Sequence, residues 1–369
     1  MSTNRPLLKR RKFLQTGSAW MLGLSLVGRP ATACAADGAP EPFDITFYHI
    51  GDPQYQALDT TLTGGVKVNN IIRENLKLMM ALKPETAMPG GFGTVGKPRG
   101  VINVGDCTQS GNEGSLGLAG THLKQWENYA KDFGLTGKEK DALINIPVYE
   151  GFGNRDQDGF FQQIIDKISL RNKSRPGVVA VSERYDYPPG KGGFNGVYAE
   201  GLHYAWMWGP IHFIHVNMRV GDSTLRYPSA GSHTFLEDYL DKKIGFSGAP
   251  VIICMHLPPS IKQESEWPLE DRQKFYDLII GYNIVAIFCG NTTSFGTEVW
   301  SGPDQKGSMP IRLIRCDCFY RSAPNDGFMN VVRIKSLPSD PNRAQLVLAR
   351  LRRNYAWADT LEIEFTINA

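Results

Sequence analysis

The sequence predicts an α/β fold built from parallel strand–helix–strand units. Short apolar runs alternate with segments of helical periodicity, and five of the runs end in an acid, an amide or a histidine. Shorter strand-like runs fill the last part of the chain. Ligands of parallel sheets bind beyond the carboxyl ends of the strands, which is where these polar residues stand. We therefore expect the functional site at those strand ends.

The first half of the chain predicts three strands separated by two helices. Each strand is an apolar run that closes in a polar turn, and the helices show apolar residues three or four positions apart. In order, these are strand Phe43–Pro53, helix Val68–Leu82, strand Val101–Asp106, helix Leu123–Phe133 and strand Ile146–Asn154.

The second half repeats this alternation and then changes to strands alone. An aromatic hairpin, Tyr204–Met218, turns at Gly209-Pro210, with Ile211–Met218 as its second strand. The strands expected next are Pro250–His256 and Ile284–Asn291, with helices at Phe235–Leu240 and Lys274–Ile280. Four short runs complete the sheet of the same domain: Ile311–Cys316, Met329–Ile334, Gln345–Leu351 and Thr360–Ile367.

Composition and charge exclude several classes of protein. The 369 residues are 41% hydrophobic and 21% charged, which is ordinary for a globular protein and excludes collagen-like and disordered chains. The formal charge is +3, but residues 1–33 hold six basic residues and no acid, leaving 34 basic against 37 acidic residues. The body of the chain therefore carries no basic footprint for nucleic acid.

The N-terminus predicts an export signal over residues 1–36, before a domain that spans 43–369. The basic stretch Lys9–Gln15 precedes the apolar run Ala19–Val27 and then small residues. Arg10-Arg11-x-Phe13-Leu14 resembles a twin-arginine signal, which implies transfer to the periplasm. The alternative is a basic amphipathic arm that stays attached. The apolar run is far shorter than the ~20 residues that span a bilayer, and no later segment qualifies as a span.

The polar strand ends form an ordered series of five blocks. Singly, each Asp or Asn is an ordinary turn residue. Together they resemble the calcineurin-like metallophosphoesterase superfamily, whose blocks run Asp-x-His, Gly-Asp, Gly-Asn-His-Asp/Glu, His-x-Pro and Gly-His-x-His. The matching segments, within a resemblance that covers roughly residues 43–335, are Gly51-Asp52-Pro53-Gln54, Gly105-Asp106-Cys107-Thr108, Gly153-Asn154-Arg155-Asp156, His256-Leu257-Pro258 and Gly290-Asn291-Thr292-Thr293-Ser294.

This resemblance implies a four-layer α/β/β/α sandwich of two mixed β-sheets flanked by helices, with two divalent metal ions at the strand ends. Carried over by position, one ion would face Asp52, Gln54, Asp106 and Thr293. The other would face Asp106, Asn154, His256 and Asn291, so Asp106 would bridge the two. Arg155 stands where the family has a histidine that protonates the leaving group. The resemblance thus makes Arg155 and Asp106 the catalytic candidates, and Asn154, Arg155 and Thr293 the substrate-binding ones.

The departures from the family pattern concern its histidines. Only His256 remains of five, because Gln54, Arg155, Asn291 and Thr293 replace the others. An arginine, with a pKa above ~12, holds phosphate but cannot donate a proton near neutral pH. The remaining ligand set is rich in oxygen and favours Ca²⁺ or Mg²⁺ over Mn, Fe or Zn. The alternative is a site without metal, in which Arg155 pairs with Asp52 or Asp106.

Two functional hypotheses follow. The first is an exported phosphoesterase that hydrolyses a small phosphate mono- or diester. The second is a pseudoenzyme on the same fold, which binds phosphate or a protein partner in the periplasm without turnover.

The cysteines and the remaining histidines favour structural roles. Cys107, Cys254 and Cys289 flank motif residues and fit buried packing, with a thiolate ligand as the alternative. Cys316-x-Cys318 is too short for an easy disulfide and lacks a second pair for zinc. His212 and His215 point to opposite faces of a strand, which favours packing over a shared metal.

Overall fold

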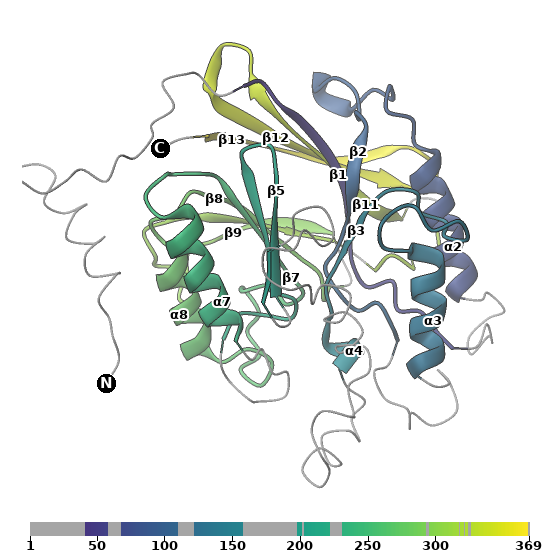
Figure 1. Cartoon of the computed structure of the whole chain (residues 1–369), viewed down its shortest axis with the longest axis horizontal. Helices are drawn as coiled ribbons and strands as arrows, with labels where there is room; N and C mark the ends of the chain where they lie inside the picture. Colours follow the sequence, from purple (N-terminus) through teal and green to yellow (C-terminus); the bar gives the residue numbers. More distant parts are fainter. Residues whose placement is uncertain are drawn as a thin grey trace, which may run out of the picture.

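The computed structural model describes residues 41–57, 68–109, 122–157, 198–200, 203–221, 231–292, 295–316, 318–320, 322–323 and 326–367. The predicted signal peptide and Thr293 lie outside these residues. Within them, the strands form one sheet of six, ordered β13-β12-β11-β1-β2-β3, and one of seven, ordered β4-β5-β6-β7-β8-β10-β9. Both sheets are mixed, and helices flank them (Figure 1). The predicted α/β sandwich of two mixed sheets is confirmed.

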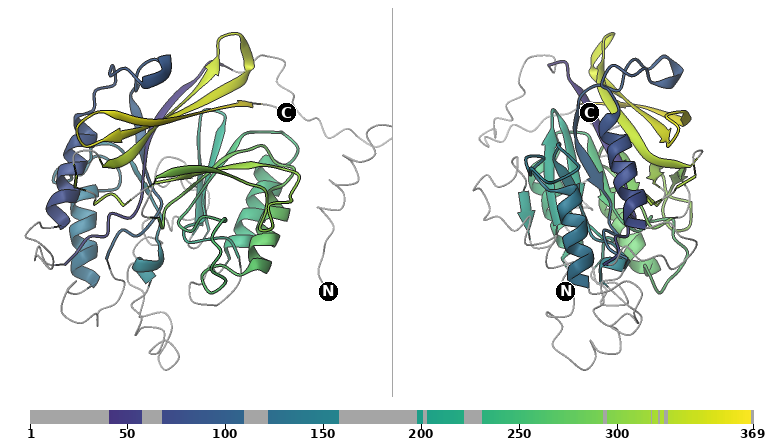
Figure 2. Two further views of the ribbon diagram at one scale, coloured as in Figure 1. Left: turned by 180° about the vertical axis from the view of Figure 1, so that it is seen from behind. Right: turned by 90° about the vertical axis from the view of Figure 1, so that its right-hand side faces the viewer.

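The first sheet joins the two ends of the chain. β1 pairs in parallel with β2, and β2 with β3, while β1 pairs antiparallel with β11. The C-terminal strands therefore lie beside the N-terminal one, as the yellow and purple ribbons show (Figures 1 and 2). The strands of this sheet are β1 (Asp44–Ile50), β2 (Pro98–Asn103), β3 (Val148–Glu150), β11 (Gly327–Leu337), β12 (Asp340–Arg352) and β13 (Trp357–Thr366).

The second sheet has a parallel centre and antiparallel edges. β6, β7, β8 and β10 run parallel, while β5 pairs antiparallel with β6 and β9 with β10. Its strands are β4 (Tyr198–Glu200), β5 (His203–Trp208), β6 (Ile211–His215), β7 (Val251–Met255), β8 (Ile284–Cys289), β9 (Gly296–Trp300) and β10 (Ile311–Arg315).

Alternation of side chains along β1 builds two of the layers. Ile45 and Phe47 point into the core between the sheets, whereas Tyr48 and Ile50 point to the opposite face. On that face they pack with α2 (Val68–Ala81) and α3 (His122–Phe133). On the other side of the sandwich, α7 (Ser232–Tyr239) and α8 (Leu269–Ile279) cover the second sheet (Figure 1).

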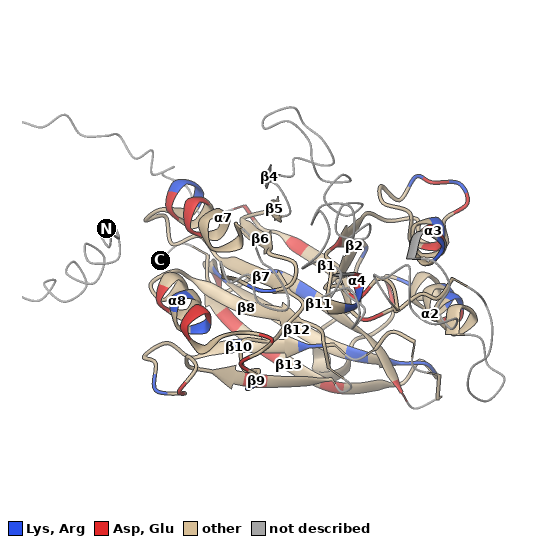
Figure 3. Cartoon of the chain, turned by 90° about the horizontal axis from the view of Figure 1, so that it is seen from below, with Lys and Arg blue, Asp and Glu red and all other residues tan. Residues whose placement is uncertain are grey.

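Charged residues lie on both the helices and the strands. Viewed from below, α3, α7 and α8 show Lys, Arg, Asp and Glu on their surfaces, and blue and red segments also mark strands of both sheets (Figure 3). The remaining short elements are a 3-10 turn η1 (Pro89–Gly91), the helix α4 (Asn154–Gln157) and a π-helical turn η3 (Leu240–Ile244) that extends α7. Among the described residues, no helix is long and apolar enough to cross a membrane.

The differences from prediction have local causes. α8 begins at Leu269, five residues before the expected helix. The prediction missed its first turn because that turn is charged and lacks apolar periodicity. Pro268 and the acids Glu270 and Asp271 nevertheless suit a helix start. The edge strand β9 alternates half-buried and exposed residues, so no apolar run marked it. β6 ends at His215, three residues before the predicted end, where the chain turns toward the candidate site.

Candidate metal centre

The parallel strands of both sheets end at the same side of the molecule, at its lower middle in Figure 1, where α4 follows β3. The residues that follow β1, β2, β3, β7 and β8 are the predicted polar ones. We call the following set the strand-end site: Asp52, Gln54, Asp106, Asn154, Arg155, His256 and Asn291.

The backbone at this site is strained at four non-glycine positions. Asp52, Gln54, Asp106 and Asn291 have φ of 53°, 53°, 55° and 53°, in the left-handed region that side chains rarely adopt. Backbone hydrogen bonds between the loop after β1 and the loop after β2 stabilise these conformations. Asp52 N donates to Gly105 O (2.9 Å), and Gln54 N donates to Asp106 O (2.9 Å). Strain of this kind persists where the surroundings impose it, which is typical of functional sites.

Asp156 connects the loop after β2 with the loop after β3 by hydrogen bonds. Its buried carboxylate accepts hydrogen bonds from Cys107 N (3.1 Å), Thr108 N (2.8 Å), the Thr108 hydroxyl (2.8 Å) and Gly153 N (2.8 Å). Gly153 is required beside it, since a Cβ atom there would overlap Asp106 Oδ1. Asp156 is thus a positioning residue for the loop of Asp106.

Three of the predicted residues form a potential metal-binding cluster. Asp52, Asp106 and His256 are 2%, 1% and 0% exposed, and one ligand atom of each lies within 4.8 Å of the others. The first sheet supplies the two carboxylates, and the second supplies the imidazole. Carboxylate oxygen and imidazole nitrogen together suit a divalent ion such as Zn or Mn.

The protonation state of His256 sharpens this arrangement. Burial lowers the pKa of its imidazole to about 4, so the ring is neutral. Both ring nitrogens face acceptor oxygens, because Nδ1 lies 3.0 Å from the carbonyl oxygen of Val104 and Nε2 lies 2.9 Å from Asn154 Oδ1. The neutral ring carries one proton, and its tautomer decides which nitrogen donates. In the Nδ1–H tautomer, the Nε2 lone pair faces Asp106 Oδ1, 3.3 Å away, which is the form in which histidine binds metals.

The buried carboxylate of Asp106 has little positive charge around it. Burial raises the pKa of its carboxyl to about 7, against the opposing effect of Arg155. Arg155 N donates to Asp106 Oδ1 (2.8 Å), and its guanidinium Nε lies 3.5 Å from Asp106 Oδ2. The side chain of Arg155 is still 42% exposed, so it reaches solvent. For a site without metal, we expect Arg155 to pair with Asp52 or with Asp106. Arg155 forms the ion pair with Asp106.

The other predicted residues surround this cluster. Gln54 Nε2 donates to Asp106 Oδ2 (3.5 Å), Asn154 Oδ1 lies 2.9 Å from His256 Nε2, and Asn291 N donates to Asp52 Oδ1 (3.3 Å). Asn291 thus contacts Asp52 through its backbone N–H. Thr293, expected as a ligand of one ion and of substrate, lies outside the described residues.

Sequence reasoning missed Asp156 and Cys318. Asp156 is the last residue of the Gly153-Asn154-Arg155-Asp156 block, so its place in that block was the available signal. Cys318 follows β10, which runs parallel to β8 and ends at the same side of the sheet. Its thiol donates to Asp52 Oδ2 (3.9 Å). Parallel pairing of β10 could have identified it, but a five-residue strand does not reveal its partner in the sequence.

The packing roles expected for two histidines agree with the structure. His212 Nδ1 lies 3.0 Å from the Tyr239 hydroxyl on α7, whereas His215 stacks on Tyr204 and faces the carbonyl of Asn103. The two rings therefore contact different layers. Cys107, Cys254 and Cys289 are buried and form no disulfide.

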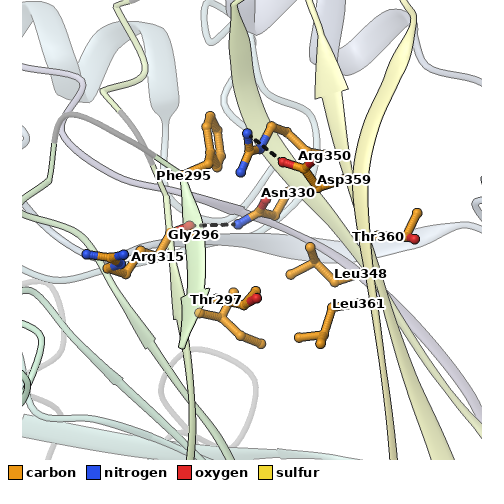
Figure 4. Close-up of a pocket in the computed structure, with 11 residues that line it drawn as sticks. Phe295, Gly296, Thr297, Arg315, Asn330, Leu348, Arg350, Asp359, Thr360 and Leu361 are labelled. Atoms are coloured by element: carbon orange, nitrogen blue, oxygen red, sulfur yellow. Dashed lines mark hydrogen bonds and ion pairs between the residues drawn. The ribbon is translucent and has the colours of Figure 1, made fainter. Parts of the chain in front are cut away.

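A separate cavity of about 130 Å³ lies between β9–β10 and β12–β13 (Figure 4). Its Arg350 side chain pairs with Asp359 (3.0 Å) and lies over the ring of Phe295. Leu348 and Leu361 line its lower part in that view. Because Arg350 is paired with an acid of the same wall, the cavity presents no free charge from this arginine to a ligand.

Comparison with known proteins gives distant likenesses. No family model matches the chain, and no curated protein matches it. Solved structures that resemble it include GAP50, the anchor in the inner membrane complex of Plasmodium, with 14% identity, 88% of this chain and 89% of that chain covered, and a TM-score of 0.47. A dimetal phosphatase from Danio rerio shows 12% identity, coverage of 87% and 99%, and a TM-score of 0.44.

A third similar structure is a 5'-nucleotidase precursor from Thermus thermophilus, with 12% identity and a TM-score of 0.34. The match covers 88% of this chain and 55% of that one. At this level of likeness, no activity is transferred to the present chain.

Proposed function

We propose that this protein is a metal-dependent hydrolase of small phosphoesters with a reduced metal site. The observation that carries the proposal is the buried cluster of Asp52, Asp106 and His256, whose ligand atoms lie within 4.8 Å of one another. A divalent cation satisfies all three groups at once. The same three residues also occupy the positions of metal ligands in the family that the sequence resembles.

The residues divide into holding and binding roles. Asp52, Asp106 and His256 would hold the ion. Asn154, whose Oδ1 lies 2.9 Å from His256 Nε2, would face the same ion, while the carbonyl of Val104 would orient the ring through Nδ1. When bound, a divalent ion polarises the phosphoryl group and lowers the pKa of an attacking water. Arg155 reaches solvent from the rim and is suited to bind the phosphate oxygens of an incoming ester.

Arg155 also limits the range of substrates. It remains a cation at neutral pH and cannot protonate a departing alkoxide. Esters whose leaving group is stable as an anion, such as nitrophenolate, should therefore react much faster than phenyl or alkyl esters. Comparing the hydrolysis rates of p-nitrophenyl and phenyl phosphodiesters measures this dependence directly.

The test of the proposal is hydrolysis of bis(p-nitrophenyl) phosphate and p-nitrophenyl phosphate by chelator-treated protein, with Mn²⁺, Zn²⁺, Ca²⁺ or Mg²⁺ added one at a time. We expect turnover with at least one ion and none with chelator. Asp106→Asn, which keeps an acceptor oxygen but removes the charge, should behave like the chelator-treated protein. Turnover equal in Asp106→Asn and wild type would overturn the proposal.

The second candidate is a phosphate-binding protein without turnover. The ion pair of Arg155 with Asp106 favours it, because a guanidinium beside a buried carboxylate supplies part of the charge that a metal would. Calorimetric titration with inorganic phosphate separates the two functions. Binding that needs no metal, is lost in Arg155→Ala and is accompanied by no hydrolysis would establish the binder.

Export to the periplasm by the twin-arginine route is part of the proposal. Its support is the Arg10-Arg11 pair and the short apolar run that follows it, within residues outside the described part of the chain. Replacing both arginines by lysine should leave the protein in the cytoplasmic fraction of a bacterial host. Equal periplasmic recovery of the two forms would remove this assignment.

A further inference from the structure

The candidate metal cluster takes its residues from both sheets, so its geometry depends on how the sheet ends are held together. Asp52 and Asp106 follow strands of the first sheet, and His256 follows β7 of the second. Two buried residues at and just after the end of β6, His215 and Asn217, form hydrogen bonds from the second sheet to the first. We call these two residues the sheet bridge.

Asn217 contacts the loops on both sides of the cluster. Its side-chain Oδ1 accepts the N–H of Phe152 (3.2 Å), two residues before Asn154, and its backbone O accepts the N–H of His256 (2.6 Å). Asn217 is 0% exposed and has a φ of 57°, in the left-handed region that asparagine tolerates better than most residues. One buried residue thus holds both the loop after β3 and the backbone of His256.

His215 provides the second contact between the sheets. Burial lowers the pKa of its imidazole to about 3, so the ring is neutral. Its Nδ1 accepts the N–H of Asn217 (3.1 Å), which places the proton on Nε2, and Nε2 donates to the carbonyl oxygen of Asn103 (3.3 Å). The next carbonyl along the chain, that of Val104, lies 3.0 Å from His256 Nδ1. The two histidines therefore contact consecutive peptide groups at the end of β2.

The sheet bridge adds something that apolar packing does not supply. Aromatic contacts around Phe47 already hold the sheets together in the interior, so cohesion of the sandwich does not require a buried amide with a left-handed backbone. Gly151 leaves room for the bridge, because a Cβ atom there would lie 2.0 Å from His215 Cε1. Hydrogen bonds fix the position of each peptide group, and metal ligands must be held to within about 0.5 Å.

We propose that Asn217 and His215 are positioning residues of the metal site, which set the separation between the two carboxylates of the first sheet and His256 of the second. Both act through the peptide groups that they contact rather than as ligands. The inference rests on the metal site of the proposed function and adds to it the residues that hold its two halves in register.

The test is the Zn²⁺ affinity of chelator-treated full-length protein, measured by competition with a chromophoric chelator. Asn217→Gly keeps the left-handed backbone and the carbonyl that accepts His256 N. It removes the side-chain amide, which accepts Phe152 N and lies 3.4 Å from His203 Nδ1. We expect the Zn²⁺ affinity of this variant to be at least about tenfold lower than that of wild type.

Asn330→Ala is the matched control. The side-chain amide of Asn330 is also buried and also contacts a buried imidazole, that of His49 (3.1 Å), but it lies in the interior. The control should unfold more readily than wild type and keep its Zn²⁺ affinity, whereas a residue that acts only on stability would give the same result at both positions.

Hydrogen exchange in wild type supplies a second readout that needs no variant. If the sheet bridge and the ion hold the same loops, bound Zn²⁺ must stabilise the bridge in turn, because such coupling is reciprocal. We therefore expect Zn²⁺ to slow exchange of the Phe152 and Asn217 amides more than exchange of the amides of β11. This measurement decides the question if Asn217→Gly does not fold.

The outcomes separate this inference from the proposed function. Zn²⁺ binding that is lost in Asp106→Asn but equal in Asn217→Gly and wild type would overturn the positioning role and leave the metal site standing. Equal slowing of exchange at Phe152 and in β11 would do the same, as would a matching loss of affinity in Asn330→Ala. Absence of Zn²⁺ and Mn²⁺ binding in wild type would overturn both the metal site and this inference.

Discussion

The two sheets meet in two different ways. In the interior, apolar side chains fill the space between them, with the rings of Phe213 and Phe288 5.5 Å and 5.7 Å from that of Phe47. His49, a buried polar residue beside them, is a neutral imidazole packed against Phe288. At the strand-end site the same sheets bury two carboxylates instead.

The difference teaches which part of the molecule is built for stability. Interior residues adopt ordinary strand conformations and, among the residues described, bury no ionised side chain beside Phe47. The strand-end site combines left-handed backbone and neighbouring buried carboxylates, each of which costs free energy. A protein retains such a combination where function requires it. The predictions that follow test this contrast between the interior and the strand-end site.

The largest effect is expected at Asp156, which holds the strand-end site together. Asp156→Ala leaves three buried N–H groups and one hydroxyl without their acceptor, so the free energy of unfolding should fall by about 3–5 kcal/mol. Urea denaturation measures it. Asp156→Asn keeps one acceptor oxygen and should lose much less. A loss below about 1 kcal/mol for the alanine variant would mean that the loops hold their shape without this carboxylate.

The next effect has the opposite sign. Asp52→Asn removes one of two neighbouring buried charges, and asparagine tolerates the left-handed backbone of that position. Without metal, the variant should therefore be more stable than wild type by about 1–2 kcal/mol. Added Zn²⁺ should stabilise wild type but not the variant.

Asp141→Asn provides the control for this comparison, because it makes the same change of net charge at an exposed position. Thermal unfolding in chelator and in Zn²⁺ should leave it indistinguishable from wild type. A metal-free Asp52→Asn protein less stable than wild type would show that the carboxylate pair is not under electrostatic strain.

The sequence alone could predict much of this contrast. Continuous apolar runs and their polar ends located Asp52, Asp106, Asn154 and His256 beside one another, because strand polarity places them at one edge. It could not predict Cys318, since nothing local to Cys316-x-Cys318 reveals that β10 runs parallel to β8. It also could not predict that the ring of His256 lies against the carbonyl of Val104, far away in the chain.

The interior should respond to acid. Burial, with a smaller effect of nearby His215, lowers the pKa of His49 to about 3, while an unfolded chain has about 6.5. Between these values the unfolded state binds the proton and the folded state does not, so stability falls as pH drops below 6.5. Between pH 7.5 and 5.5 this residue should cost about 1.4 kcal/mol.

His49→Gln isolates that contribution. Glutamine offers an acceptor to Asn330 Nδ2, which lies 3.1 Å from His49 Nδ1, but does not titrate. Denaturation at the two pH values should show a stability loss about 1.4 kcal/mol smaller in the variant than in wild type. An equal loss of stability in the variant and in wild type would mean that His49 takes up a proton in the folded state. The interior would then accommodate a buried charge, contrary to the contrast drawn above.

The smallest effect compares two glutamines with the same backbone. Gln54 and Gln305 have φ of 53° and 60°, one in the strand-end site and one exposed in the loop after β9. Gln305→Gly should relieve strain but loses an exposed hydrogen bond, which Gln305 Oε1 accepts from Ser301 N (3.2 Å), so after the entropy cost of glycine the gain in stability should be at most about 0.5 kcal/mol. Gln54→Gly should gain less, because Asp106 Oδ2 loses its amide donor.

The same two variants should also differ in metal affinity, and here the larger change is expected in Gln54→Gly. Gln54→Gly removes an amide next to Asp106 and should weaken Zn²⁺ binding severalfold, measured by competition with a chromophoric chelator, while Gln305→Gly should match wild type. Unchanged affinity in Gln54→Gly would remove that residue from the ligand set. Gln305→Ala loses the same Ser301 contact but keeps a side chain in the left-handed backbone, so a Gln305→Gly protein no more stable than Gln305→Ala would remove backbone strain from the contrast.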